Sequence, residues 1–158
     1  MTMEGNDMIV GLYRLPDCAP PENIKIKRAF VGDKQKILYF VENQFGKGWL
    51  GETEHALMQE VPKCFIATEN GRIIGFACYD ATARGYFGPI GVDASCRGKS
   101  VGAALLIATL NAMREYGYGY AVIGWVNEAA GFYRKTVGAV NIPGGTPENT
   151  VYSNMVIM

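Results

Sequence analysis

Apolar and polar residues alternate with a period of two in the first half of the chain. Ile24-Lys25-Ile26-Lys27 carries apolar and charged side chains in turn, which predicts a strand with one buried and one solvated face. Two longer apolar segments, Lys63–Thr68 and Arg72–Tyr79, are separated by a short polar turn. Because Asn and Gly both tolerate a positive φ, Asn70-Gly71 in this turn indicates a hairpin. The centre of the predicted sheet is therefore antiparallel.

Four segments show the apolar spacing of a helix. The longest, Ala103–Tyr116, places apolar side chains at intervals of three and four residues and is rich in strong helix formers. Three shorter helices are predicted at residues 33–45, 53–60 and 128–135, with Asp33, Thr53 and Asn127 as their N-caps. We therefore expect two helices before the hairpin and two after it.

Two apolar strands, Tyr86–Val92 and Tyr118–Val126, flank the longest helix. A strand, a helix and a strand of these lengths predict a right-handed crossover between parallel neighbours. Pro89 interrupts the first strand beside two glycines, and Pro lacks the N–H that a central ladder needs. We expect this strand to bulge and to leave backbone groups unpaired, where they are free to bind a ligand.

The two ends of the chain add further predicted elements. Met8–Leu15 is read as a short strand or a packed arm, and Ala139–Ile142 and Val151–Met158 as a final pair of strands. The 158 residues fit one domain, 1–158, in which residues 1–23 form the N-terminal strand or arm.

The turn before the longest helix is a candidate phosphate site. Arg97 and Lys99 lie beside glycines at the start of the helix, where free N–H groups and the positive end of the dipole attract an anion. Gly98-Lys99-Ser100 copies the end of a P-loop, but Asp93 stands where that motif requires its first glycine. A dinucleotide-binding glycine pattern is also missing after the strands.

The same turn, Arg97-Gly98-Lys99-Ser100-Val101-Gly102, resembles motif A of the GNAT superfamily of acetyl-CoA-dependent N-acyltransferases. Ser100 stands where the family prefers glycine. The segment from Asn127 to Ala139 resembles the second signature of the family, with Phe132-Tyr133 at its centre. From Lys25 to Met158 the order of elements is similar to the GNAT fold. The resemblance implies an α/β (α+β) fold with a mixed, mostly antiparallel sheet of about seven strands, splayed between strands 4 and 5 and flanked by about four helices.

The resemblance also implies a site for acetyl-CoA in that splay. The residues expected to contact it are Ile90, Gly91, Val92, Arg97, Gly98, Lys99, Ser100, Val101, Gly102, Asn127, Ala130 and Tyr133. Backbone groups of residues 90–92 would bond to the pantetheine arm and the thioester carbonyl, and the turn would hold the pyrophosphate. Tyr133 would place its hydroxyl near the sulfur. A phenol there can donate a hydrogen bond to the departing thiolate, whereas the alternative for Tyr133 is a packed aromatic beside Phe132.

The amine acceptor needs a group that removes its proton, because an ordinary alkylamine is protonated at pH 7. Asp80, at the end of a strand, is the first candidate, and it is also expected to contact the substrate; Glu42, Glu54 and Glu69 are the others. The alternative for Asp80 is a turn cap. Trp49 and Trp125 are predicted to line the acceptor pocket, although Trp49 also suits a packed position in the core.

Composition narrows the partners. Fifteen basic and fifteen acidic residues give no general attraction to nucleic acid or to an anionic membrane. The polar N-terminus and the four scattered cysteines favour a cytoplasmic protein with reduced thiols, and a single histidine gives no basis for a metal site.

The resulting prediction is an N-acetyltransferase that uses acetyl-CoA as co-substrate and a small primary amine, such as an amino sugar, as acceptor. A homodimer is compatible with this reading. The alternative is a non-catalytic acyl-CoA-binding sensor that lacks an acceptor site.

Overall fold

A computed structural model describes residues 4–156 of the chain. Its seven strands form one open sheet in the order β2-β3-β4-β5-β6-β1-β7. The strands are β1 (Asn6–Gly11), β2 (Ile24–Arg28), β3 (Cys64–Glu69), β4 (Arg72–Tyr79), β5 (Tyr86–Val92), β6 (Tyr120–Val126) and β7 (Val140–Asn141). The helices are α1 (Lys34–Phe45), α2 (Leu50–Leu57), α3 (Val101–Tyr116) and α4 (Ala130–Val137). The predicted fold class is confirmed.

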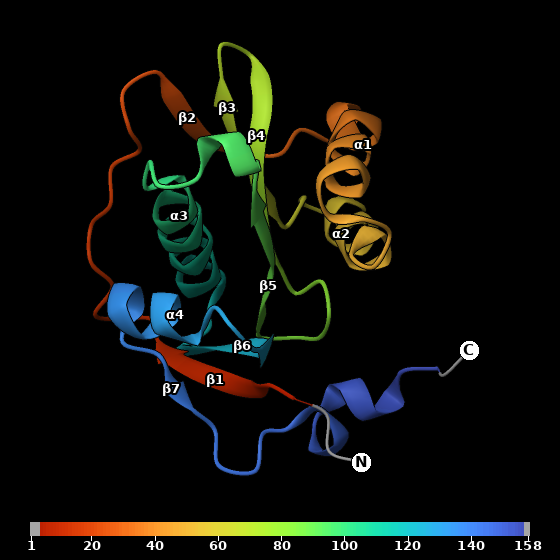
Figure 1. The fold of residues 1–158 in the computed structure, drawn as a ribbon, viewed down its shortest axis with the longest axis vertical. Helices are drawn as coiled ribbons and strands as arrows, with labels where there is room; N and C mark the ends of the chain where they lie inside the picture. Colours follow the sequence, from red (N-terminus) through yellow and green to blue (C-terminus); the bar gives the residue numbers. More distant parts are fainter. Residues whose placement is uncertain (1–3, 157–158) are drawn as a thin grey trace.

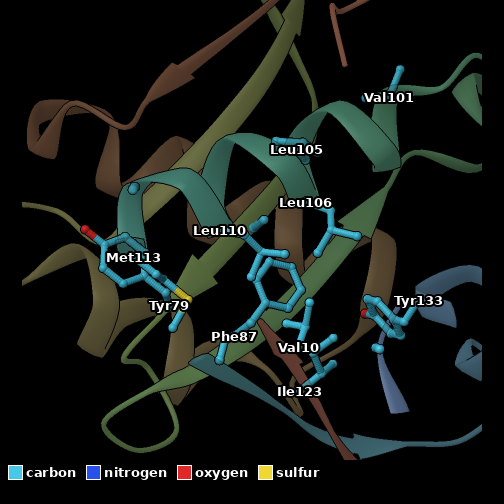
Figure 2. Close-up of a cluster of buried hydrophobic side chains, with 14 of the residues drawn as sticks. Val10, Tyr79, Phe87, Val101, Leu105, Leu106, Leu110, Met113, Ile123 and Tyr133 are labelled. Carbon is cyan, nitrogen blue, oxygen red and sulfur yellow. The ribbon is translucent and has the colours of Figure 1, made fainter. Parts of the chain in front are cut away.

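Helices cover the sheet on both faces. α3 lies on one side, and α1 and α2 lie on the other (Figure 1). The α3 layer is apolar because Leu105, Leu106 and Leu110 recur at helical spacing and are all fully buried. Figure 2 shows Leu106 and Leu110 on the side of α3 that faces Phe87 of β5, and Leu105 lies against Gly75 of β4. This packing fixes β5 and β6 from one side, so that their relative position is set by the core.

The N-terminal strand is an interior part of the sheet. β1 pairs antiparallel with β6 on one side and with β7 on the other. Its inward residues Met8 and Val10 are almost completely buried. The sequence analysis left a strand and a packed arm open for this segment, and the structure shows a strand. This strand connects β6 to β7 in the second half of the sheet.

The predicted final strand Val151–Met158 is wrong. Residues Val151–Asn154 form a 3₁₀ helix, whose start is capped by the Thr150 hydroxyl accepting from the Tyr152 N–H at 3.4 Å. β7 is limited to two residues and pairs with β1, which occupies the position beside it in the sheet. Residues 157–158 lie outside the described part of the chain.

Two of the three predicted N-caps are wrong. α2 begins at Leu50, and Thr53 is buried within it, its hydroxyl donating to the Trp49 carbonyl at 2.8 Å. Asp33 occupies the N-cap position of α1 as predicted, but its carboxylate pairs with Lys36 at 3.3 Å instead of accepting from a backbone N–H of the helix. α4 starts at Ala130, without a side-chain cap from Asn127. In each case the first N–H group of the helix already donates to a backbone carbonyl three residues earlier, at Val31, Lys47 and Asn127.

Within residues 4–156, every helix is too short or too polar to cross a membrane.

Candidate functional site

The cleft of the molecule opens where β5 and β6 separate. These parallel strands pair only at Tyr86 with Val122 and at Phe87 with Ile123. Beyond Phe87 they diverge, and a cleft of about 1220 Å³ lies between them. Its walls come from β5, β6, the turn before α3, the first part of α4, the start of α2 and the C-terminal 3₁₀ helix. The predicted splay between the fourth and fifth strands of the GNAT-like part of the chain is therefore present.

The β5 wall presents unpaired backbone groups to this cleft. The register of β4 and β5 shifts between Ala77 and Tyr79, which places the predicted bulge at Gly88-Pro89. In an antiparallel pair, every second residue directs its N–H and C=O away from the partner strand. Beyond Phe87, such groups of β5 point away from β4 and face the cleft. The Val92 carbonyl confirms this direction, since it accepts from Arg97 Nε at 3.4 Å instead of pairing with β4. Ile90, Gly91 and Val92 all line the cleft, as predicted.

The turn Arg97–Gly102 forms one end of the cleft. Gly98 and Ser100 both have positive φ, 82° and 60°, and α3 starts immediately after them. The first N–H groups of α3 have no partner within the helix and point into this end. A Cβ added at Gly102 would lie 3.7 Å from Phe132 and 3.8 Å from Val92, so a longer side chain would enter the cleft. Lys99 is exposed and does not line the cleft.

Tyr133 enters the cleft from α4. It is buried, and its ring packs edge-to-face on Phe87 with centroids 6.2 Å apart. Its hydroxyl has no hydrogen-bond partner among residues 4–156. Burial raises the pKa of this phenol well above its usual range, so the hydroxyl stays protonated at neutral pH. Asn127 lines the cleft beside it, whereas Ala130 packs against the core instead.

Trp49 and Trp125 line the cleft from elements other than the turn, Trp49 from the start of α2 and Trp125 from β6. Trp49 lines the cleft and also packs on Phe45, with ring centroids 5.2 Å apart. The side chain therefore occupies both predicted positions, in the pocket wall and in the core. Trp125 has a left-handed backbone with φ 47°. Its N–H donates to Asp7 Oδ1 and its Nε1 donates to the Glu4 carbonyl, both at 2.8 Å. The N-terminal segment therefore orients the second tryptophan.

Asp80 lies outside the cleft, apart from the other predicted site residues. Its carboxylate is buried and accepts from Lys63 Nζ at 2.8 Å, from the Gly85 N–H at 2.8 Å and from the Tyr118 hydroxyl at 2.9 Å. The alternative of a turn cap describes this arrangement, and the position gives no support to the predicted catalytic and substrate roles. The other candidate bases, Glu42, Glu54 and Glu69, also lie away from the cleft.

Glu52, Thr82 and Tyr152 are among the polar cleft residues that the sequence analysis did not name individually. The Thr82 hydroxyl donates to Glu52 Oε2, and the Tyr152 ring packs on Trp125 with centroids 5.0 Å apart. Placing Thr53 as the helix cap put Glu52 before the helix. Because residues 151–158 were predicted as a strand, the 3₁₀ turn that places Tyr152 over β6 was not expected. The spacing of Trp49 and Glu52, three residues apart on one helical face, was the available signal.

Comparisons with known proteins agree with this geometry. A family model described as "Acetyltransferase (GNAT) family" matches residues 28–139. No curated protein sequence matches the chain. Among solved structures, a GCN5-related N-acetyltransferase from Sphaerobacter thermophilus is similar, with 22% identity and a TM-score of 0.68 over 89% of this chain and 50% of that one.

Two further structures have the same fold. One is a fungal multi-domain β-N-acetylglucosaminidase with a GCN5-related glucosamine N-acetyltransferase region, with 17% identity and a TM-score of 0.69 over 87% of this chain and 20% of that one. The other is an aminoglycoside acetyltransferase from an uncultured soil metagenomic sample, in complex with trehalose, with 21% identity and a TM-score of 0.55 over 72% of this chain and 87% of that one. This chain thus spans only a fifth to half of the first two structures.

The matched segment is long enough to decide the family. Residues 28–139 contain β5 and β6, which form the two walls of the cleft, and the turn Arg97–Gly102 between β5 and α3. The family model therefore covers the splay together with both sequence signatures. By this match, this chain belongs to the GNAT family of acetyltransferases.

Proposed function

We propose that the protein transfers the acetyl group of acetyl-CoA to the primary amine of a small acceptor. The observation that carries this proposal is one continuous cleft with two chemically different ends. One end offers free N–H groups and Arg97 to an anion. The other end is lined by Trp49, Trp125 and Tyr152, which suit a compact organic molecule.

The residues present fit acetyl-CoA. Nothing lies within 4 Å of a Cβ built at Gly88 or at Gly98, so the β5 wall and the turn both leave room for close approach of a ligand to the backbone. The N-terminus of α3 would bind the pyrophosphate. Backbone groups of β5 beyond Phe87 would orient the pantetheine amides, adding a strand-like partner on the open side.

The chain supplies a proton donor beside the reacting atoms. When bound, acetyl-CoA supplies a thioester whose acetyl carbon is open to attack by an amine. Tyr133 would then donate a hydrogen bond from its neutral phenol to the departing sulfur. Its otherwise unpartnered hydroxyl favours this role over a purely packed aromatic, although the ring also contributes to the core.

For the acceptor, we favour amino sugars and other compact hydroxylated amines. Of the two carboxylates that line the cleft within residues 4–156, Glu52 is the one beside the hydroxyls of Thr82 and Tyr152. Polybasic acceptors would need several carboxylates for electrostatic complementarity. Two structures of the same fold are named for glucosamine and aminoglycoside acetylation, which is consistent with this choice.

An acceptor screen at fixed acetyl-CoA tests this proposal. We expect a higher kcat/KM for glucosamine than for spermidine or a lysine-rich peptide. A clear preference for spermidine would contradict this reading of the pocket. The homodimer predicted from the sequence stays a prediction, which sedimentation of the purified protein would test.

A further inference from the structure

The start of α2 brings one carboxylate into the aromatic end of the cleft. Trp49 precedes α2 and Glu52 lies in its first turn, so both side chains reach the cleft from one face of the helix. Glu52 is half-buried there, close to Thr82 and Tyr152. Glu128, the other acidic residue of the lining, is exposed on the turn beside Asn127, towards α4.

Glu52 has one oxygen held and one oxygen available. The Thr82 hydroxyl donates to Oε2, and Oε1 has no partner among the residues that the structure describes. A carboxylate fixed through one oxygen keeps its orientation and still accepts a hydrogen bond through the other. This arrangement is suited to an N–H donor that arrives from the cleft.

The loop that carries Thr82 is itself anchored to α2. His55 Nδ1 lies 2.7 Å from the Ala81 carbonyl, and Gln59 Nε2 donates to the Asp80 carbonyl at 2.8 Å. Glu52, His55 and Gln59 follow each other on one side of the helix and its end. These contacts fix Thr82 relative to Glu52, so the geometry of the pair is built into the fold.

The neighbouring Tyr152 completes a polar corner. The Tyr152 hydroxyl lies against Gly124 of β6, and a Cβ added at Gly124 would overlap this hydroxyl. Position 124 therefore has no room for a side chain. Burial, and after it the negative charge of Glu52, raise the pKa of Tyr152 to about 12. The phenol therefore remains neutral at pH 7. Positive charge in the lining, by contrast, comes from Arg97 in the turn before α3 and from Lys135 in α4.

We propose that Glu52 is the carboxylate that receives the ammonium group of the acceptor and removes its proton, and that Thr82 positions it. The proton moves from the ammonium nitrogen to Glu52, which leaves a free electron pair on that nitrogen. The nitrogen then forms a bond to the acetyl carbon as the carbon–sulfur bond breaks and its electron pair stays on sulfur. Tyr133 gives its proton to that sulfur, and the second proton lost by the nitrogen restores the phenol, so the products are an amide, a thiol and one proton on Glu52.

This role rests on the proposed function, and Glu52→Gln tests it. The amide oxygen of Gln still accepts from Thr82, so the fold is expected to survive. With glucosamine at pH 6.5, we expect kcat/KM to fall by about 10²–10⁴-fold. The loss should shrink towards pH 9.5, where the amine is free without a base. Glu54→Gln on the exposed side of the same helix is the matched control, because its partner Lys34 lies 3.7 Å away outside the cleft.

A binding measurement adds a readout that does not need turnover. Glucosamine is titrated into the CoA-bound protein at pH 6.5, with the fluorescence of Trp49 and Trp125 as signal. We expect the Kd to rise about tenfold in Glu52→Gln, as for the loss of one charged hydrogen bond, and to stay unchanged in Glu54→Gln.

The outcomes separate the two proposals. Equal kcat/KM in Glu52→Gln and wild type, or a loss that is the same at every pH, would overturn the role of Glu52 while acetyl transfer stands. Wild-type protein that neither binds glucosamine nor releases thiol with it would overturn the amino-sugar acceptor and, with it, the role of Glu52 as stated.

Discussion

Tyr133 combines a buried ring with a hydroxyl that has no hydrogen-bond partner in the described part of the chain. Tyr133→Phe removes only the donor to the leaving sulfur, so we expect kcat to fall by about 10²–10⁴-fold. The acetyl-CoA affinity, measured by calorimetry, should change by less than about twofold. Because burial raises the pKa of Tyr133, its ionisation should not limit the wild-type rate between pH 7 and pH 9. Tyr39→Phe, on the exposed side of α1, is the control, and a retained rate in Tyr133→Phe would exclude the acid role.

Asp80 was predicted as a catalytic and substrate-binding residue, but the structure places it in a buried ion pair. Its carboxylate pairs with Lys63, and both side chains are nearly inaccessible, at 5% and 10% exposure. Removing one partner leaves an uncompensated buried charge. We expect Asp80→Asn to lower the free energy of unfolding by about 3–5 kcal/mol, measured by urea denaturation. Glu54→Gln, which breaks the exposed pair with Lys34, should cost about 0–1 kcal/mol.

The pH dependence of this pair follows from Lys63. Burial alone would lower its pKa, but the hydrogen bond and charge of Asp80 hold the pKa above its ordinary value. A raised pKa gives stability that is fully present below the unfolded value and is lost as the pH rises through the folded value. The difference between wild type and Asp80→Asn should therefore be constant from pH 7 to pH 9 and shrink above pH 10.5. Unchanged stability with a lost kcat would instead restore Asp80 as a base.

At the residue level, the cleft positions named by the two signatures were predictable, with Lys99 and Ala130 as exceptions, and those of the acceptor end were not. Gly102 and Tyr133 lie in the cleft because their motif fixes the local backbone. Ser100 takes a left-handed conformation with φ 60°, which explains why glycine suits this position. Glu52 and Tyr152 depend on where α2 begins and how the C-terminal segment turns, and these are set by tertiary packing.

The N-terminus of α3 is the element on which cofactor binding depends. At Gly102 a Cβ makes only ordinary contacts, with Phe132 and Val92, so the fold should accept a substitution. A longer acidic side chain would both fill the anion site and repel the phosphates. We expect Gly102→Glu to weaken acetyl-CoA binding by at least about 100-fold, measured by calorimetry, with unchanged thermal stability.

Gly51→Glu is the matched control for that substitution. Gly51 is exposed in the first turn of α2, and nothing lies within 4 Å of its added Cβ. The same change of charge there should leave acetyl-CoA binding as in the wild type. Full affinity in Gly102→Glu with an intact fold would remove the turn from the binding site.

For the whole molecule, the N-terminal strand decides how the second half of the sheet is built. β1 separates β6 from β7, and Met8 is 0% exposed whereas Val140 of the edge strand is 58% exposed. We expect Met8→Ala to lower the free energy of unfolding by about 2–5 kcal/mol. Val140→Ala should cost less than about 0.5 kcal/mol. Equal, small effects in urea denaturation would mean that β1 is a peripheral arm.

The part of the fold from β3 to β6 was predictable because local sequence patterns determine its strands and helices. The hairpin of β3 and β4 and the crossover through α3 follow from turn chemistry and apolar spacing. The insertion of β1 between β6 and β7 was not, since it joins residues more than 100 positions apart. Nothing local in Asn6–Gly11 indicates which strand edge it fills.

Acetyl transfer is tested most directly by the initial rate of thiol release from acetyl-CoA with and without a small primary amine. We expect a rate that rises with glucosamine concentration and saturates, well above background hydrolysis. Saturable binding of acetyl-CoA with no amine-dependent thiol release, across a panel of primary amines, would contradict acetyl transfer and leave a cofactor-binding sensor.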